Sequence, residues 1–137
     1  MSEGVVVLDA GAIDLATTNR EFRWVLRDLV EGGWTPLIPT VVLAEAITGR
    51  PEDAPTNQTI NRVDTVDTDQ PMARHAGVLR FRASRSGGRT PSRTPSGIDA
   101  IVAAHAAQAD VGVVFTTDPS DLRRLLVDHP NIRVEKP

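Results

Sequence analysis

Cysteine and tyrosine are both missing from this 137-residue chain, and each absence excludes a kind of chemistry. Without cysteine there is no disulfide and no thiolate metal site, which is typical of proteins from a reducing compartment. Only three Phe and two Trp are present, so we do not expect an aromatic platform on which nucleic-acid bases stack.

Long apolar runs are missing as well. No stretch approaches the ~20 residues that a membrane-spanning helix needs. The first residues, Met1 to Gly4, lack the basic flank and the length of a signal peptide. We therefore expect a soluble, cytoplasmic protein, with residues 1–137 forming a single domain.

Acidic residues are absent from one long stretch, although the net charge is −3. None lies between Asp69 and Asp99, where six arginines occur: Arg74, Arg80, Arg82, Arg85, Arg89 and Arg93. The overall charge argues against a protein that coats nucleic acid through its general field. Part of this stretch, residues 84–97, is rich in Ser, Gly, Arg, Thr and Pro, and we predict a long loop there.

Apolar patterns predict alternating strands and helices. Strands are expected at 5–8, 34–38, 111–116 and 132–134, with a short extended segment at Val66. We predict helices from a Thr18/Glu21 capping box to Gly32, from a Thr40 cap to about residue 48, over 57–63, 72–83 and 98–109, and from Pro119 onward. This order is typical of an α/β protein with three layers, a central parallel sheet of four to five strands flanked by helices.

Carboxylates gather near the strand ends of this predicted sheet. Asp9 follows the most apolar strand, Asp118 follows the 111–116 strand, and Asp99 and Glu45 lie near helix starts on the same edge. Converging carboxylates repel one another, and a hard divalent cation such as Mg²⁺ or Mn²⁺ removes that repulsion. The three histidines show no zinc spacing, so carboxylate chemistry is the better interpretation.

Each of these acids also has an ordinary structural explanation. Ser96 and Asp99 have the spacing of a capping box, and Asp118 before Pro119 is typical of a helix N-cap. Glu45 fits a solvated helix position. Only Asp9, at the polar end of an apolar strand, favours a functional role by itself, so the case depends on the whole set.

Four segments in sequence resemble the motifs of PIN-domain nucleases. They are Val7-Leu8-Asp9-Ala10, the run 39–45 ending at Glu45, the run 98–106 containing Asp99, and the run 116–122 beginning Thr116-Thr117-Asp118. Their order and spacing match over nearly the whole chain. Among stand-alone PIN domains of this length, the chain is similar to the VapC toxins of VapBC toxin–antitoxin pairs.

The resemblance implies a ribonuclease that holds one or two Mg²⁺ or Mn²⁺ ions with Asp9, Glu45, Asp99 and Asp118. Asp121 matches an acid often found after the fourth motif and ranks second as a ligand. Thr116 or Thr117 would hydrogen-bond a carboxylate or a metal-bound water. The implied reaction hydrolyses RNA to 5′-phosphate and 3′-hydroxyl ends without a covalent intermediate.

The resemblance also implies partners. VapC toxins dimerise and are inhibited by a VapB antitoxin that inserts a basic side chain into the acidic site, so a homodimer and a VapB-like antitoxin are expected. The substrate would be tRNA, rRNA or mRNA. We expect Arg85, Arg89 and Arg93 to bind RNA phosphates, although the alternative is a solvated linker. Trp24 lies opposite its helix's apolar face and marks either a partner surface or packing against the next loop.

Three other functions compete with this interpretation. The first is a catalytically silent PIN fold that only binds RNA or protein, which the presence of all four acids disfavours. The second is a phosphoryl-transfer domain of the receiver or haloacid dehalogenase type; these need a lysine opposite the phosphate, and the sole lysine here is Lys136 in the C-terminal tail. The third is a DNA-directed nuclease of the same fold, which the sequence leaves open.

Overall fold

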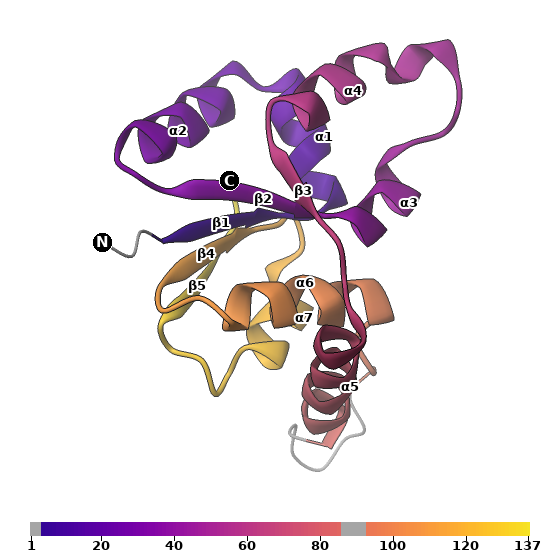
Figure 1. Cartoon of the computed structure of the whole chain (residues 1–137), viewed down its shortest axis with the longest axis vertical. Coiled ribbons are helices and arrows are strands. Elements are labelled where there is room, and N and C mark those ends of the chain that lie inside the picture. Colours follow the sequence, from indigo (N-terminus) through magenta and orange to yellow (C-terminus); the bar gives the residue numbers. More distant parts are fainter. Residues whose placement is uncertain (1–3, 86–92) are drawn as a thin grey trace.

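A parallel sheet forms the centre of the protein. The structure is a computed structural model that describes residues 4–85 and 93–137. Within these residues the sheet has five strands in the order β3-β2-β1-β4-β5, all parallel (Figure 1). The strands are β1 (Val5–Leu8), β2 (Thr35–Pro39), β3 (Asp64–Val66), β4 (Gly112–Phe115) and β5 (Ile132–Glu135). The predicted α/β class and parallel sheet are confirmed.

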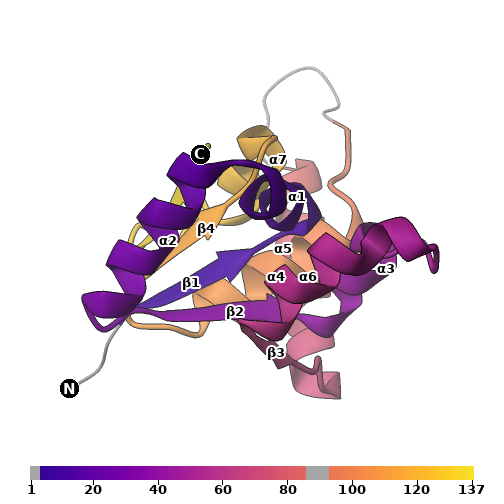
Figure 2. The ribbon, with the colours of Figure 1, turned by 90° about the horizontal axis from the view of Figure 1, so that it is seen from above.

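Helices cover both faces of this sheet and make the three expected layers. One layer contains α1 (Ala10–Thr18), α2 (Arg20–Glu31), α3 (Leu43–Ala46) and α4 (Ala54–Asn61). The other contains α5 (Gln70–Arg85), α6 (Gly97–Ala107) and α7 (Pro119–Leu125). Figure 1 shows the two layers on opposite sides of the strands, and Figure 2 shows the layer of α1 to α4 from above, in front of the sheet. No helix among the described residues is long and apolar enough to cross a membrane.

The core sits between the central strands and the inner helices. Val6, Val7 and Leu8 of β1 are fully buried because helices cover both sides of a parallel sheet, which is why β1 has no polar alternation. Val113 and Val114 of β4 are buried beside them, in register with Val6 and Val7. From α6, the helix with the most apolar face, Val102 and its alanine neighbours complete this core.

The first helix was missed by the sequence analysis, and the cap expected for the second was wrong. Residues 10–18 form α1, whose buried face is Ala12, Ile13 and Ala16. Small side chains make that face inconspicuous in the sequence. Because α1 includes Thr18, the N-cap of α2 is Asn19, whose side chain accepts a hydrogen bond from the Phe22 backbone at 2.9 Å.

The helix expected after Thr40 is also different. Thr40 does not cap it but begins a short 3₁₀ turn, Thr40–Val42, which continues into the four-residue α3. Helix α5 ends at Arg85 and helix α6 begins at Gly97. The connection between them, 86–96, is therefore shorter than the predicted loop 84–97. Residues 86–92 of that loop, including Arg89, lie outside the described part of the chain.

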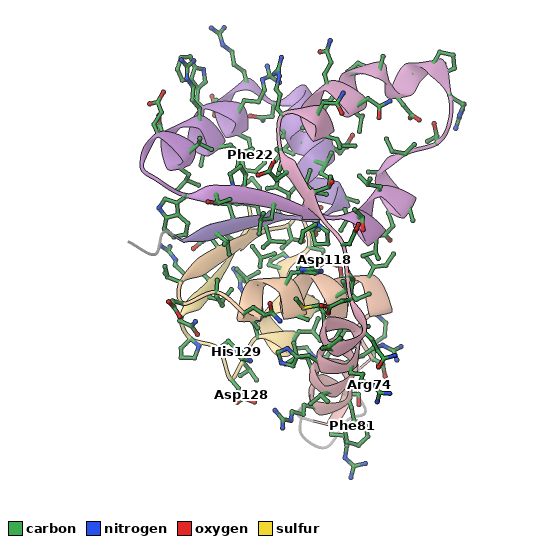
Figure 3. The ribbon with its side chains drawn as sticks, in the orientation of Figure 1. Phe22, Arg74, Phe81, Asp118, Asp128 and His129 are labelled. Carbon is green, nitrogen blue, oxygen red and sulfur yellow. The ribbon has the colours of Figure 1, made fainter. Side chains whose placement is uncertain are left out.

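The apolar side of α2 is only partly covered, contrary to the face predicted for it. Phe22 is buried and packs edge-on against Phe115 at a centroid distance of 5.0 Å (Figure 3). The sequence predicts one apolar helical face from Phe22, Val25, Leu26, Leu29 and Val30. Two of these residues, Val25 and Val30, are 44% and 48% exposed. The reason is the position of α2, which makes most of its contacts with α1 and β2 and leaves Val25 and Val30 at the surface of the described residues. The helix ends at the predicted glycines: Gly32 is its C-cap, and Gly33 follows with a positive φ of 96°.

Candidate functional site

Two of the predicted acids flank the point where the strand order reverses. From β1 the chain crosses to β2 on one side, and β4 pairs with β1 on the other side. Asp9 follows β1 and Asp118 follows β4, so both lie beyond the carboxyl ends of neighbouring strands. This is where open α/β sheets bind their ligands. Asp118 is labelled in Figure 3. The Asp9 backbone N–H also donates to the Phe115 carbonyl at 3.5 Å, which ties the two strand ends together.

Asp9 has a structural role in addition to its place at the switch point. Its Oδ1 accepts a hydrogen bond from the Ala12 backbone at 2.8 Å, so Asp9 is the N-cap of α1. Burial raises the pKa of the Asp9 carboxyl, and the nearby charge of Asp118 raises it further. Hydrogen bonds from Thr116 and from the backbone of α1 act in the opposite direction. The carboxylate is thus held in place, with its charge only partly compensated.

Asp99 is the carboxyl on which the charges of the other acids converge. The Ser96 side chain accepts from the Asp99 backbone at 3.0 Å, as the predicted capping box requires, so the Asp99 side chain sits in the first turn of α6. Burial raises the pKa of Asp99 to about 6, and the charges of Asp9, Asp121 and Glu45 contribute to that rise. The structure therefore brings Asp9, Asp121 and Glu45 within electrostatic range of Asp99.

Asp118 and Glu45 are both exposed acids at the rim of this group. Asp118 occupies the N-cap position of α7, but its side chain accepts from the Ser120 hydroxyl at 3.3 Å and makes no capping bond. Its backbone N–H donates to the buried Thr116 hydroxyl at 3.1 Å. Glu45 projects from α3, and its charge reaches Asp99.

Gly11 allows the start of α1 to approach the turn that carries Asp118. A Cβ atom at Gly11 would overlap the Thr117 hydroxyl, so any larger residue requires Thr117 to move. Thr117 itself is exposed, and among the two predicted threonines it is Thr116 that hydrogen-bonds to Asp9. The close contact between Gly11 and Thr117 keeps the two acid-bearing strand ends adjacent.

Asp121 is buried and forms two ion pairs. Its Oδ2 lies 3.1 Å from Nη2 of Arg93, and its Oδ1 lies 3.2 Å from Nη1 of Arg124. Of the arginines predicted to bind RNA, Arg93 is thus next to the acids, whereas Arg85 lies at the end of α5 with its guanidinium over the Phe81 ring. Arg124 was missed by the sequence analysis, because nothing in the local pattern of α7 distinguishes it from the preceding Arg123.

The donor set at this site fits a hard divalent cation by its chemistry. Carboxylate oxygens are the ligands that Mg²⁺ and Mn²⁺ prefer. The pKa of Asp99 is raised first by burial and then by repulsion from the neighbouring acids, and a cation would relieve that repulsion. Over residues 4–85 and 93–137, however, no three acidic or histidine side chains stand close enough together to hold an ion. The carboxylates are coupled by charge without forming a closed ligand cage.

The histidines take no part in this acidic group. His105 is buried in α6, where its Nε2 lies 2.9 Å from the Thr68 hydroxyl, and burial lowers its pKa. The rings of His75 and His129 face each other edge-on at a centroid distance of 6.2 Å, joining α5 to the turn before β5. Their positions agree with the absence of zinc spacing in the sequence.

Two grooves lie beside α2, away from the carboxylates. One, of about 600 Å³, runs between α2, α4 and the start of β2. Trp24 is 51% exposed at this groove and stacks with the Arg27 guanidinium, 5.6 Å from the ring centroid. The other groove, of about 620 Å³, lies between α2 and the C-terminal residues. Neither groove is lined by any of the four acids predicted as metal ligands.

Solved structures of VapBC and FitAB bound to DNA contain chains with the same fold. A chain of VapBC2 from Rickettsia felis bound to a promoter DNA fragment superposes with a TM-score of 0.72 at 19% identity, over 96% of this chain and 98% of that one. A chain of DNA-bound VapBC from Salmonella typhimurium superposes with a TM-score of 0.66 at 22% identity, over 99% of this chain and 98% of that one. A chain of FitAB bound to an IR36 DNA fragment superposes with a TM-score of 0.65 at 17% identity, over 96% of this chain and 94% of that one.

No protein-family model matches the sequence, and no curated protein matches it at a significant level. The structural likeness nevertheless covers almost the full length of this chain and of the chain compared with it in each case. The protein therefore has a PIN-like fold, and the resemblance predicted from the four motifs is confirmed at the level of the fold.

Proposed function

We propose that this protein is a divalent-metal-dependent endoribonuclease that acts as the toxin of a VapBC-type toxin–antitoxin pair. The observation that carries the proposal is the position of Asp9 and Asp118 beyond the carboxyl ends of neighbouring strands, together with Asp99, which the charges of Asp9 and Glu45 reach. Bringing several negative charges near one another is unfavourable, and a bound cation removes that repulsion. The fold shared with VapBC and FitAB chains gives independent support.

In this proposal Asp9, Glu45, Asp99 and Asp118 hold Mg²⁺ or Mn²⁺. The bound cation would activate water and neutralise charge on the phosphodiester. Thr116 orients Asp9 through its hydrogen bond and fixes the backbone at Asp118. Arg93, at the edge of the group, would bind a phosphate of the substrate.

The direct experiment is a cleavage assay with matched single-stranded RNA and DNA, with Mg²⁺, with Mn²⁺ and with EDTA. The proposal requires RNA cleavage that depends on the metal and leaves 5′-phosphate ends. Cleavage of the DNA alone would instead assign the site to a DNA-directed nuclease. Binding of RNA without any cleavage would indicate the catalytically silent alternative.

Replacing Gly11 by alanine is expected to lower RNA cleavage about tenfold or more, because small displacements of catalytic groups have large effects on rate. The added methyl group displaces Thr117 and, with it, the turn that presents Asp118. Stability should change little, since alanine favours the helix by about 1 kcal/mol and offsets part of the steric cost. The measurements are initial cleavage rates and thermal denaturation.

Gly77→Ala is the matched control, because it lies inside α5 and a Cβ atom there would meet nothing within 4 Å. It should leave the cleavage rate unchanged. Full activity of Gly11→Ala would show that the contact with Thr117 does not position the acids.

For the partner, we propose that a VapB-like antitoxin binds the groove containing Trp24. The groove combines an apolar floor with a basic rim; its basic residues are Arg20, Arg23, Arg27 and Arg62, and Glu31 is its one acid. Such a surface is complementary to an amphipathic segment with acidic side chains. The exposed part of α2, including Val30, would be covered by that segment.

Trp24→Ala is expected to weaken binding of the antitoxin by about ten- to a hundredfold, because a large exposed aromatic side chain in a groove has the properties of an interface hot spot. The antitoxin to test is the product of a short reading frame that adjoins the gene, and calorimetry gives the dissociation constant. Val127→Ala serves as control, since Val127 is 65% exposed but lies outside this groove. Equal affinities for both variants would place the antitoxin elsewhere.

A homodimer remains a prediction from the resemblance alone. Light scattering on the purified chain measures its mass in solution without any partner. A single molecule of 14.8 kDa at all concentrations would contradict the expected dimer.

A further inference from the structure

Arg124 connects three parts of the protein that surround the acidic site. Its Nη2 donates to the Ala83 carbonyl in the last turn of α5 at 2.9 Å. Its Nη1 donates to the Arg93 carbonyl at 2.8 Å and lies 3.2 Å from Oδ1 of Asp121. Arg124 itself belongs to α7. Its guanidinium therefore connects α7 to the end of α5 and to the segment that precedes α6.

The segment 93–96 is held along its length by a second arginine. The Arg80 Nε donates to the Pro95 carbonyl at 2.7 Å, and Pro95 is fully buried. Ser96 then caps α6 and orients Asp99. The backbone between Arg93 and Asp99 is therefore fixed relative to the carboxylates, although it belongs to the long connection between two helices.

The two arginines that pair with Asp121 differ in their freedom. The Arg124 side chain is 25% exposed and its donors go to backbone carbonyls, so its position is fixed. The Arg93 side chain is 81% exposed, and an ion pair in that setting contributes little to stability because solvent screens it. Arg93 thus has a fixed backbone and a guanidinium that leaves Asp121 at little cost.

We propose that Arg124 is a positioning residue that holds Arg93 at the edge of the carboxylate group, where Arg93 binds a phosphate of the RNA strand next to the one that is cleaved. Asp121 anchors Arg124, pairs with Arg93 when no RNA is bound, and is not a metal ligand. Arg124 acts through Arg93 and does not contact RNA. This inference rests on the proposed ribonuclease function and assigns one element of its substrate recognition.

The salt dependence of RNA binding tests this arrangement without any catalysis. A labelled single-stranded RNA is titrated in EDTA at several salt concentrations, and fluorescence anisotropy gives the dissociation constant. Each phosphate contact contributes about 0.7 to the slope of log affinity against log salt for a single strand. Arg93→Ala should therefore lower the slope by about 0.7 and weaken binding about tenfold at moderate salt.

The positioning role makes a specific prediction for Arg124. Arg124→Gln should lower the slope by the same amount as Arg93→Ala, and the double variant should show no further decrease. Arg124→Lys keeps the charge but cannot reach two carbonyls and a carboxylate together, so it should also lose the Arg93 contact. Arg123→Gln is the matched control: it removes the same charge from the next residue of α7, whose guanidinium donates to the Val134 carbonyl at 3.2 Å.

Three results would overturn the inference. An unchanged slope for Arg124→Gln or Arg124→Lys would show that Arg124 does not position Arg93. A double variant whose slope falls by about 1.4 would mean that Arg124 contacts RNA by itself. A salt-dependence slope that falls as much in Arg123→Gln as in Arg124→Gln would indicate a general charge effect. A wild type that binds RNA in EDTA but never cleaves it would refute the proposed ribonuclease function and leave the Arg93 arrangement standing.

Discussion

Asp9→Asn is expected to reduce metal-dependent RNA cleavage on the order of a thousandfold while the protein stays folded. The substitution removes one negative charge from the centre of the acidic group but keeps an oxygen that accepts the Ala12 N–H. Asparagine is as good an N-cap as aspartate, so α1 should begin at the same residue. Because burial raises the pKa of Asp9, the neutral side chain should not destabilise the metal-free protein.

Two further variants separate the catalytic role of Asp9 from its role as a cap. Asp9→Ala removes both and should lower stability by about 1 kcal/mol in addition to the loss of activity. Asp14→Asn removes an exposed charge from the same helix and should behave as wild type. Cleavage rates and denaturant unfolding are the measurements. An active Asp9→Asn protein would remove Asp9 from the metal site, and an unfolded one would show that its role is structural.

Asp99→Asn is expected to make the metal-free protein more stable at neutral pH and less responsive to metal. The pKa of Asp99 is raised from 3.8 to about 6, first by burial and then by the neighbouring acids. The folded protein thus binds a proton more tightly than the unfolded chain. Protonation of Asp99 therefore stabilises the folded protein. This contribution to the free energy of unfolding is fully present below pH 4 and is lost as the pH rises from about 4 to about 6.

The rise in pKa corresponds to about 3 kcal/mol, which solvent screening of this half-exposed group reduces to about 1–2 kcal/mol. Above pH 7 in EDTA, Asp99→Asn should therefore melt about 3–6 °C higher than wild type. Adding Mg²⁺ or Mn²⁺ should raise the midpoint of wild type more than that of the variant, because an ion that binds only the folded state stabilises it by mass action.

The difference between the two proteins across pH is the informative measurement, because all other acids titrate in both. The advantage of Asp99→Asn should shrink as the pH falls from 7 to 4, and Asp14→Asn should show no such trend. If wild type does not respond to either metal and Asp99→Asn is no more stable, the acids are helix caps and surface charges. The nuclease proposal would then rest on the fold alone.

The site was predictable to the extent that it depends on strand ends. Asp9 and Asp118 follow continuous apolar runs, and parallel strands place such residues on one edge of the sheet. The sequence also predicted the Ser96 cap that orients Asp99. In each case the signal is local: a period, a cap or the end of an apolar run.

Other parts of the site were not predictable, because they depend on contacts between distant segments. Arg124 meets the Ala83 and Arg93 carbonyls across 41 and 31 residues of sequence, and its chemistry does not distinguish it from other surface arginines. The burial of Asp121 likewise follows from the packing around α7. Asn19 replaced Thr18 as a cap because an unrecognised helix, α1, ends where α2 begins.

The sequence by itself determined the α/β class, the parallel sheet and the acids at its carboxyl edge, because hydrophobic periodicity and capping act over a few residues. Only the tertiary structure decided which charges meet. It set the raised pKa of Asp99, the ion pairs of Asp121 and the exposure of Val25 and Val30 on α2, since burial and electrostatic coupling depend on which elements pack together.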